Sequence, residues 1–291
     1  MIGDGEPVFT VKINKVPKMT DMLTSTSITL GEAYMNGDIE IEGDLYTALN
    51  MFLGQMGKFS TDKKKLKNII FTSKSKANQK KEVSSHYDIG NDFYKMWLDE
   101  TLSYSCGYFK NDNDTLYQAQ CNKVDRILEK LNLSENMTLC DIGCGWGFLL
   151  IEAAKKYKIN GVGITLSKEQ KAKFEQRIKD EGLSERLEVK LLDYRDLPKL
   201  NKKFDRVVSV GMIEHVGRGN YEEFMQCVKS VLKPGGIFVL HFISSLKEYP
   251  GDAWVKKYIF PGGVIPSLRE IIQIAGEQRF YTVDVESLRR H

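Results

Sequence analysis

Short apolar runs alternate with amphipathic stretches over the part of the chain that begins near residue 83. The apolar runs predict strands and the amphipathic stretches predict helices. The strands are expected at 138–141, 159–164, 187–191, 204–210 and 237–241, and helices at 148–157 and 167–181. Strands that alternate with helices form a parallel sheet with helices on both faces. We therefore expect an α/β domain with a doubly wound sheet over residues 83–291.

The first 57 residues follow a different pattern. Alternation over 8–13 predicts a strand, and the glycines and Asn-Gly pair of 31–38 predict a short turn. Residues 44–53 predict an amphipathic helix with Asp44 as its N-cap. A unit of this size buries too little surface to be stable alone. We expect a small N-terminal α+β domain that packs on the second domain or a second chain, or that contacts a membrane through exposed apolar side chains.

Composition favours a folded, intracellular protein. The chain has 291 residues, of which 42% are hydrophobic and 28% charged, values that suit a globular protein of two domains. No apolar run approaches the roughly 18 residues that span a bilayer. Met1–Glu6 lacks the basic and then apolar order of a signal peptide. The five cysteines include no Cys-x-x-Cys pair, which argues against a disulfide framework and a zinc site, so we expect no metal.

Positive charge is concentrated in one stretch, although the net charge of the chain is only +3. Residues 58–82 form a lysine-rich linker, in which Lys58–Lys81 contains nine lysines and the single acid Asp62. The rest of the chain is therefore net acidic. Such a linker could bind anionic lipid or nucleic acid. Charge alone favours the simpler interpretation, a solvated segment between two domains.

A glycine-rich turn is the first chemical signal. The segment Asp141–Gly147 joins the first predicted strand of the α/β domain to its first helix. Glycines there let the backbone bend tightly and approach a ligand, and the helix N-terminus suits an anionic group. The spacing is Gly-x-Gly-x-Gly, and the second strand ends at 163–167 without the acid that holds the ribose of a dinucleotide. Both observations count against NAD.

Asp141–Gly147 resembles motif I of class I S-adenosylmethionine-dependent methyltransferases. Further segments narrow the resemblance to the bacterial cyclopropane-fatty-acyl-phospholipid synthase family, over residues 1–291. These segments are 30–35, 86–94, 102–109, 163–170, 210–217 and 257–263. The resemblance implies a class I methyltransferase domain with a Rossmann-like sheet at 83–291, after a lipid-docking domain at 1–57 and the linker at 58–82. Family members extend beyond this sequence, so we expect that its C-terminal end is missing, together with a tyrosine that contacts bicarbonate.

The reaction that the resemblance implies is methylene transfer from S-adenosylmethionine to the cis double bond of an unsaturated acyl chain in a membrane phospholipid. An alkene is a poor nucleophile, so close alignment with the methyl donor is a major catalytic requirement. After methyl transfer a base must remove a proton so that the cyclopropane ring closes. The resemblance assigns this role to a bound bicarbonate. Its ligands fall on Cys106, Glu214, His241 and the backbone of Ile243.

The resemblance also assigns the cofactor contacts and the partners. The residues expected to bind S-adenosylmethionine are Tyr104, Ser105, Asp141, Gly143, Gly145, Gly147, Thr165, Leu166, Gln170, Asp193 and Tyr194. A homodimer is implied, in the cytoplasm and peripherally bound to the inner face of the membrane through the lysine-rich linker. Aromatic faces near the site would stabilise cations or simply form core packing. They belong to Tyr87, Phe93, Tyr94, Tyr104, Tyr108 and Phe109.

Three alternatives come from other function classes. A lipid C-methyltransferase without ring closure, acting on this or another lipid such as mycolate, would not need the set Cys106, Glu214 and His241. A non-enzymatic lipid-binding protein would not need the glycine turn. A nucleic-acid methyltransferase would suit the lysines, but no Asn-Pro-Pro-Tyr motif for a target base occurs, so we expect no nucleic-acid partner.

Overall fold

The computed structural model of the chain describes residues 7–67, 75, 90–289 and 291. The chain divides into two units. The first combines Met1–Phe71 with Pro250–Gly262, and the second combines Thr72–Tyr249 with Gly263–His291. The domain boundaries expected from the sequence stay a prediction. Residues 68–74 and 76–82 of the lysine-rich linker lie outside the described residues.

The first unit is an α+β arrangement around two antiparallel strands, β1 and β2. Its elements are β1 (Phe9–Ile13), α1 (Met19–Thr24), α2 (Thr26–Met35), β2 (Ile39–Gly43), α3 (Leu45–Leu53), η1 (Met56–Lys58) and α12 (Ala253–Tyr258). The predicted strand at 8–13 and the predicted helix at 44–53 are confirmed. The Asp44 carboxylate caps α3 by accepting hydrogen bonds from the backbone nitrogens of Tyr46 and Thr47 at 3.3 and 2.9 Å.

The prediction of a turn at 31–38 is wrong for residues 31–35, which are helical. Gly31 lies inside α2, and the chain turns only after the helix, at Gly37, whose φ is +74°. A Cβ on Gly31 would lie 2.3 Å from the indole nitrogen of Trp254 on α12. The glycine therefore allows an aromatic ring to approach the helix backbone. Glu32 strengthens the same contact by accepting hydrogen bonds from Lys257 and Tyr258.

The second unit contains a five-stranded parallel sheet with the strand order β5-β4-β3-β6-β7. Its strands are β3 (Thr138–Ile142), β4 (Asn160–Thr165), β5 (Leu187–Leu191), β6 (Phe204–Val210) and β7 (Leu232–His241). Its helices are α6 (Asn91–Lys95), α7 (Leu116–Leu131), α8 (Phe148–Tyr157), α9 (Lys168–Asp180), η2 (Tyr194–Leu200), α10 (Ile213–Val216), α11 (Tyr221–Val231) and α13 (Leu268–Glu277). The predicted doubly wound sheet is confirmed.

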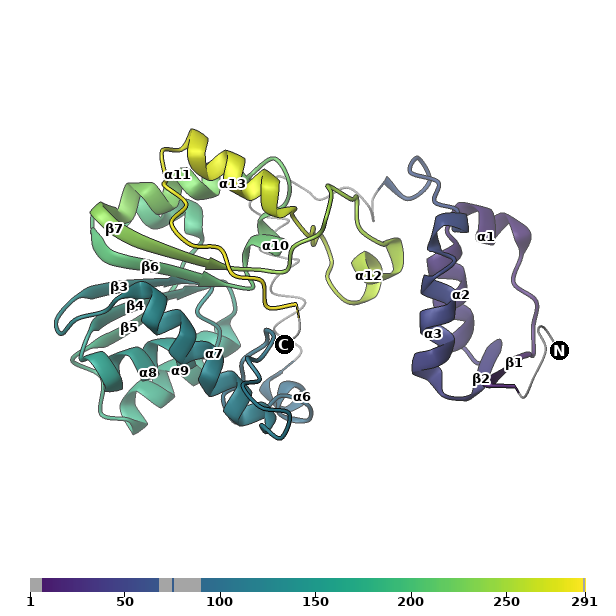
Figure 1. Cartoon of the computed structure of the whole chain (residues 1–291), viewed down its shortest axis with the longest axis horizontal. Coiled ribbons are helices and arrows are strands. Elements are labelled where there is room, and N and C mark those ends of the chain that lie inside the picture. Colours follow the sequence, from purple (N-terminus) through teal and green to yellow (C-terminus); the bar gives the residue numbers. More distant parts are fainter. Residues whose placement is uncertain (1–6, 68–74, 76–89, 290) are drawn as a thin grey trace. The chain divides into compact units, whose positions relative to one another are not determined.

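Two hydrophobic cores cover the two faces of this sheet. Figure 1 shows α7, α8 and α9 on one face and α11 and α13 on the other. Because successive residues of a strand point to opposite faces, neighbouring residues of β3 belong to different cores. Leu139 packs in the core with α7, α8 and α9, whereas Cys140 and Ile142 pack in the core with η2, α11 and α13.

Strand order places a crevice at the carboxyl end of β3. The chain proceeds from β3 to β4 and β5 on one side, and then returns to β6 and β7 on the other. Connections therefore leave β3 and β6 in opposite directions, which opens a ligand site between them in sheets of this kind. The backbone nitrogens of Gly143 and Cys144 both donate to the Ile164 carbonyl at 3.0 Å, which fixes the start of the glycine turn.

Strand β7 begins earlier than the sequence predicts. Its regular ladder with β6 starts at Ile237, as expected, but Leu232 already pairs with Phe204 across an irregularity. The Pro-Gly-Gly segment between them hides this pairing from a hydrophobicity pattern. Among the described residues, no helix combines the length and the apolar character needed to cross a membrane.

We expect Gly147→Ala to lower the free energy of unfolding by more than about 3 kcal/mol, as measured by urea denaturation. Gly147 has a φ of +84°, and a Cβ there would lie 2.0 Å from the Phe174 ring. Left-handed backbone costs an alanine about 1–2 kcal/mol, and overpacking adds about 1–3 kcal/mol. Gly145→Ala is the control, since Gly145 has a φ of +53° but open space around its Cβ position. Equal losses in the two variants would contradict the steric explanation.

Candidate active site

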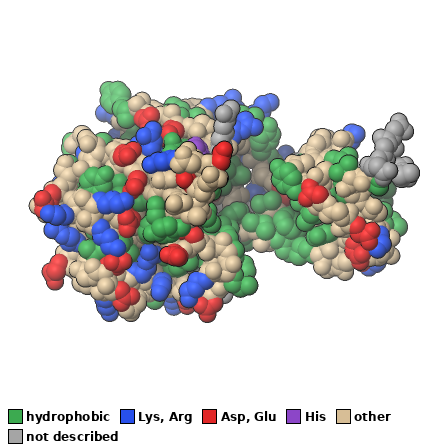
Figure 2. All heavy atoms as spheres, turned by 60° about the horizontal axis from the view of Figure 1, so that its bottom comes forward, with side chains coloured by type: hydrophobic (Ala, Val, Ile, Leu, Met, Phe, Trp, Pro, Cys, Tyr) green, Lys and Arg blue, Asp and Glu red, His purple; other side chains and the backbone are tan. Residues whose placement is uncertain are grey.

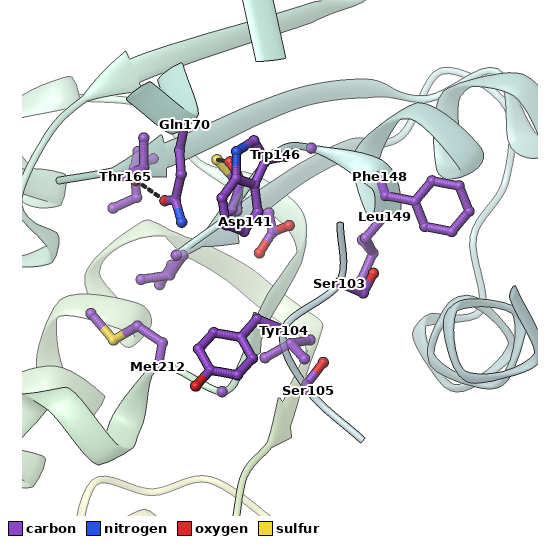
Figure 3. A pocket seen from close by; sticks show the side chains of 18 of the residues that line it. Ser103, Tyr104, Ser105, Asp141, Trp146, Phe148, Leu149, Thr165, Gln170 and Met212 are labelled. Atoms are coloured by element: carbon purple, nitrogen blue, oxygen red, sulfur yellow. Dashed lines mark hydrogen bonds between the residues drawn. The ribbon is translucent and has the colours of Figure 1, made fainter. Parts of the chain in front are cut away.

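A pocket lies at the carboxyl edge of the sheet in the second unit (Figure 3). The glycine turn after β3, the end of β4 and the end of β6 contribute one side of its lining. The segment 101–105 and α7 contribute the other. Predicted cofactor residues that line this pocket are Tyr104, Ser105, Asp141, Gly143, Gly145, Gly147, Thr165, Leu166, Gln170 and Tyr194. Their roles as cofactor ligands stay a prediction.

The turn itself depends on backbone that other residues rarely adopt. Gly143, Gly145 and Gly147 have φ values of +83°, +53° and +84°. A Cβ on Gly143 would lie 2.8 Å from the Met212 side chain, so this glycine also makes room for the loop after β6. The turn therefore needs glycine for its conformation, and the open space beside Gly145 leaves its backbone accessible from the pocket.

Asp141, at the end of β3, is the acid of the pocket. Its side chain is 3% exposed, and its Oδ1 atom has no hydrogen-bond partner among the described residues. Burial raises the pKa of this carboxyl from 3.8 to about 7. A buried carboxylate without a partner is costly, so the arrangement suits a ligand that brings an ammonium group.

Neutral polar groups line the pocket beside β4. The Thr165 hydroxyl donates to Gln170 Oε1 at 2.7 Å, and Ser167 caps α9 by accepting a hydrogen bond from the Gln170 backbone nitrogen. Because the Gln170 oxygen is engaged in this way, its amide nitrogen points toward the pocket (Figure 3). This side of the pocket therefore offers a hydrogen-bond donor where a dinucleotide site would have an acid.

Asp193 and Tyr194 lie at the start of η2, but only Tyr194 is among the residues that line the pocket. Tyr194 lines the pocket and is 3% exposed. The Asp193 carboxylate accepts hydrogen bonds from Arg195 Nε and Nη2 at 2.8 and 2.7 Å, and from the Arg195 backbone nitrogen at 2.9 Å. Asp193 is not among the residues that line the pocket. Its carboxylate is committed to the protein in this structure.

The four residues expected to bind bicarbonate form two pairs. Cys106 Sγ lies 3.5 Å from His241 Nε2, and the Ile243 backbone nitrogen donates to Glu214 Oε1 at 2.7 Å. Two polar atoms of this group, Glu214 Oε2 and His241 Nδ1, are buried without a partner among the described residues. The Ile243 amide is occupied by Glu214, so an anion would have to share or replace that bond.

Burial sets the protonation states of these side chains. It raises the pKa of the Glu214 carboxyl and of the Cys106 thiol, and it lowers the pKa of His241 from 6.5 to about 4. The Lys123 ammonium, whose charge opposes a second cation nearby, lowers the pKa of His241 further. At neutral pH the imidazole and the thiol are therefore uncharged, and Glu214 keeps a proton more readily than an exposed glutamate.

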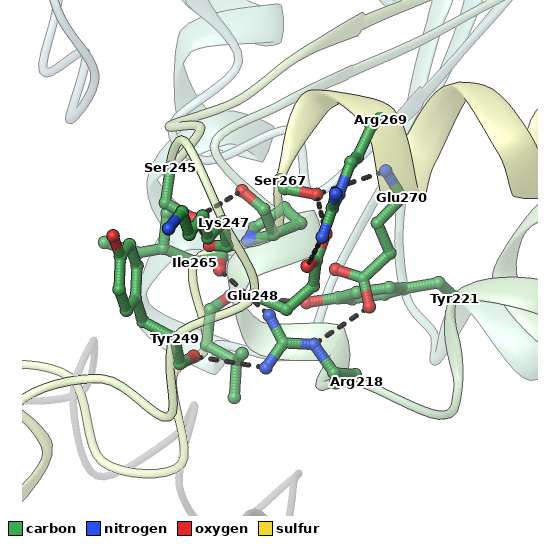
Figure 4. A network of polar contacts seen from close by, with 12 residues as sticks. Arg218, Tyr221, Ser245, Lys247, Glu248, Tyr249, Ile265, Ser267, Arg269 and Glu270 are labelled. Carbon is green, nitrogen blue, oxygen red and sulfur yellow. Dashed lines mark hydrogen bonds and ion pairs between the residues drawn. The ribbon is translucent and has the colours of Figure 1, made fainter.

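A polar network holds the loop after β7 against the start of α13 (Figure 4). Arg218 donates to the Glu270 carboxylate at 2.8 Å and to the Tyr249 carbonyl at 3.1 Å. The Glu248 carboxylate accepts from Arg269 Nε at 2.8 Å and also from Arg269 Nη2. These bonds hold Glu248 and Tyr249, at the end of the loop that begins with the Ile243 amide, in a fixed position.

The aromatic residues named from the sequence divide between pocket and core. Tyr94 is 1% exposed and packs on Tyr104 and Trp146, with ring centroids 5.9 and 5.1 Å apart. Of the described members of that set, only Tyr104 lines the pocket; Tyr108 stacks on His291 instead. Tyr87 lies outside the described residues. The set therefore does not form one continuous wall around the pocket.

The sequence pattern does not predict a role at this site for Gln120 and Lys123 on α7. Gln120 Nε2 donates to the Ser105 carbonyl at 2.9 Å, and Lys123 Nζ donates to Ser105 Oγ at 2.7 Å. A signal was present in the sequence, because Lys123 occupies the same helical stripe as Ile127 and Leu131. A lysine in the middle of an apolar stripe indicates a buried, functional or structural role.

Comparison with known proteins agrees with this geometry. A family model described as mycolic acid cyclopropane synthetase matches residues 74–291, and a model described as a domain of unknown function, DUF7884, matches residues 1–64. The chain is 39% identical over 285 residues to a Pseudomonas putida protein named probable fatty acid methyltransferase, covering 95% of this chain and 72% of the relative. It is 41% identical over 269 residues to the cyclopropane-fatty-acyl-phospholipid synthase of Escherichia coli K12, covering 90% of this chain and 68% of the relative.

A solved structure shows the same fold. The mycolic acid cyclopropane synthase CmaA1, complexed with S-adenosylhomocysteine (SAH) and CTAB, has a TM-score of 0.67 and 34% identity, over 73% of this chain and 78% of that one. The second unit is thus an α/β class I methyltransferase fold, as the sequence predicts.

We expect Asp141→Asn to flatten the pH dependence of stability. Because burial raises the pKa of Asp141 from 3.8 to about 7, the stability that its protonated form contributes is present below pH 3.8 and lost as pH rises toward 7. The ligand-free variant should therefore gain about 2–4 kcal/mol on the wild type between about pH 4 and about pH 8, measured by urea unfolding.

Asp205→Asn provides a control of opposite sign. Burial opposes ionisation of Asp205, but hydrogen bonds from Lys233 and Thr138 lower its pKa to about 2. The ionised Asp205 carboxylate therefore stabilises the folded protein fully above pH 3.8, and this stabilisation is lost as the pH falls toward 2. A wild-type and an Asp141→Asn curve that stay parallel would show that Asp141 is not buried as described.

Proposed function

The chain belongs to the mycolic acid cyclopropane synthetase family and is an S-adenosylmethionine-dependent methyltransferase, and we propose that it builds cyclopropane rings in membrane phospholipids. In the proposed reaction a methylene is added across the cis double bond of an unsaturated acyl chain. The observation that carries this proposal is a set of buried polar atoms without protein partners at one edge of the sheet. These are Asp141 Oδ1, Glu214 Oε2 and His241 Nδ1.

The pocket residues fit the methyl donor. When bound, S-adenosylmethionine supplies an electrophilic methyl group on a sulfonium. The Asp141 carboxylate would pair with its ammonium group, and the turn from Gly143 to Gly147 would allow close approach of the backbone. Gln170 offers a neutral donor on the opposite wall. Tyr104 and Trp146 bring apolar faces that exclude water and tolerate a sulfonium without hydrogen-bond donors.

Ring closure requires a base, which we propose is bicarbonate held by Cys106, Glu214, His241 and Ile243. The alkene electron pair forms the first new carbon–carbon bond as the sulfur–methyl bond breaks, and the proton then lost from that methyl goes to the base while its electron pair closes the ring. When bound, bicarbonate supplies this base. Glu214, whose pKa burial raises, can donate its proton in a hydrogen bond to an anion. His241, uncharged at neutral pH, offers its free Nδ1 atom.

The first unit is suited to a lipid surface. Its described residues expose large apolar side chains, which Figure 2 shows in green on one face of the molecule. The most exposed are Val8, Val16, Met19 and Tyr46. Exposed lysines of the linker surround the buried Leu66. Apolar contact combined with basic residues binds anionic membranes reversibly. The resemblance to phospholipid synthases also supports a peripheral membrane enzyme that forms a homodimer, and both belong to this proposal.

The proposed reaction is tested with vesicles of cis-unsaturated phospholipid, S-adenosylmethionine and bicarbonate, followed by mass spectrometry. We expect a gain of one CH₂ in a product that resists ozonolysis. Glu214→Gln should reduce turnover by about 10²–10⁴-fold, because an amide can still donate a hydrogen bond to the base but cannot exchange a proton with it. Its affinity for SAH should change by less than about 3-fold, since Glu214 does not line the cofactor pocket.

Glu223→Gln is the matched control, because Glu223 is an exposed glutamate on α11. A gain of one CH₂ with the double bond retained would instead establish a lipid C-methyltransferase without ring closure. No gain, with SAH bound normally, would point to a different acceptor or a lipid-binding role.

We expect charge reversal of the linker to weaken membrane binding. Each basic residue near an anionic surface contributes about 1 kcal/mol, so replacing four lysines by glutamate should weaken vesicle binding by at least about 100-fold at low salt. The positions are Lys63, Lys64, Lys65 and Lys67. A control with the same net charge reverses four exposed lysines of the second unit. These are Lys155, Lys158, Lys168 and Lys179. Equal effects in a sedimentation assay would refute a specific role for the linker.

A further inference from the structure

Lys123 is a buried cation that makes no ion pair among the described residues, although Asp99 acts on its charge through a longer-range electrostatic interaction. Its side chain is 3% exposed on α7, and it forms no ion pair within the described part of the chain. Burial lowers its pKa to about 8, so it remains largely protonated at neutral pH. A buried charge is costly unless an opposite charge compensates it. Because Lys123 lines the pocket, the missing anion can come from a ligand.

The hydrogen bonds of Lys123 determine what Ser105 can do. Lys123 Nζ donates to Ser105 Oγ at 2.7 Å and to Gln120 Oε1 at 2.5 Å. Gln120 Nε2 in turn donates to the Ser105 carbonyl at 2.9 Å. A hydroxyl group has one proton and accepts through its oxygen. Since Ser105 Oγ accepts from the lysine, its proton is directed away from Nζ. Ser105 lies at the edge of the pocket beside Tyr104 (Figure 3).

Charges of opposite sign thus line one pocket without neutralising each other. Asp141 contributes a carboxylate with an unpartnered oxygen, and Lys123 contributes an ammonium group behind the Ser105 hydroxyl. A ligand that carries an ammonium and a carboxylate on the same carbon would satisfy both. The amino-acid end of S-adenosylmethionine is such a group.

We propose that Lys123 is a positioning residue for the cofactor, which acts through Ser105 to direct a hydroxyl proton at the cofactor carboxylate. Asp141 faces the ammonium group of the same carbon. The inference rests on the proposed function, since it takes the pocket as the cofactor site and Ser105 as a cofactor contact. Bicarbonate has the same carboxylate chemistry, and Cys106 and His241 lie within the electrostatic reach of Lys123. The test therefore separates the two anions.

The test compares two ligands by isothermal titration calorimetry in buffer free of bicarbonate. SAH carries the amino-acid end, and 5′-methylthioadenosine lacks it. Lys123→Met keeps the apolar stem and removes the charge. We expect it to weaken SAH binding by about 10–100-fold, the range of a lost hydrogen bond to a charged group. Binding of 5′-methylthioadenosine should change by less than about 2-fold, because its contacts are elsewhere.

Ser105→Ala shows whether Lys123 acts through the hydroxyl. In that background Lys123→Met should weaken SAH binding by less than about 3-fold further, because the shared contact is already lost. Lys130→Met is the control on the same helix, since Lys130 pairs with Asp284 and Glu286 away from the pocket. It should leave both affinities unchanged.

Several results would overturn the proposal. Equal losses of SAH and 5′-methylthioadenosine affinity would assign Lys123 a structural role only. A full loss in the Ser105→Ala background would exclude action through Ser105. A loss that arises only after bicarbonate is added would assign the charge to that anion. Failure of the wild type to bind SAH would overturn both this inference and the proposed function. If Lys123→Met weakened SAH binding selectively, as expected, but the wild type formed no cyclopropane ring in the vesicle assay, only the proposed function would be overturned.

Discussion

Strand β3 is the element on which both cores and the pocket depend. Both of its edges are paired, with β4 and with β6, and both of its faces are covered. Each face of β3 therefore needs apolar side chains. Leu139 packs in the core on one face of the sheet, and Cys140 packs in the core on the other. Because the chain leaves β3 and β6 in opposite directions, their connections diverge and leave a pocket at the carboxyl ends of the two strands. The glycine turn bends the chain away from this gap, and the pocket is the space that remains.

The polar groups at this edge differ from those elsewhere in the core. The buried Ser209 hydroxyl donates to the Ile142 carbonyl at 2.8 Å, and the Asn220 amide donates to the Val216 carbonyl at 3.0 Å. Folding thus satisfies buried polar groups where the protein provides partners. Asp141, Glu214 and His241 each retain an atom without one. Trp254, Glu270 and His291 also have a buried polar atom without a partner among the described residues, but only at the carboxyl edge of the sheet do such atoms lie beside a pocket.

Much of the second unit could be predicted because its signals are local and strong. The helix at 148–157 was bounded by a glycine turn and a clear apolar face, and the structure has the same bounds. Failures arose where distant residues decide. The sequence predicts a turn at Gly31, because nothing near this glycine in the sequence reveals its contact with Trp254. The burial of Lys123 is not predicted, because a lysine on a helix usually faces solvent.

The site was predictable only in part for the same reason. The motif placed Asp141 and the glycines together, since they are consecutive. Family resemblance named Cys106, Glu214 and His241, and their roles stay predictions. Resemblance also named Asp193, yet the structure commits its carboxylate to Arg195 two residues further along. Pairings of this kind depend on rotamers, which a sequence pattern does not specify.

The contact of Gly31 with Trp254 has a consequence for how such a protein can be inherited. Helix α12 belongs to the first unit, although the chain reaches it only after completing β7. A gene that exchanged the first unit by a single recombination event would separate the glycine from the indole that requires it. The codons for Gly31 and Trp254 must therefore be inherited together. A substitution at either position is tolerated only if the residue at the other position still fits it.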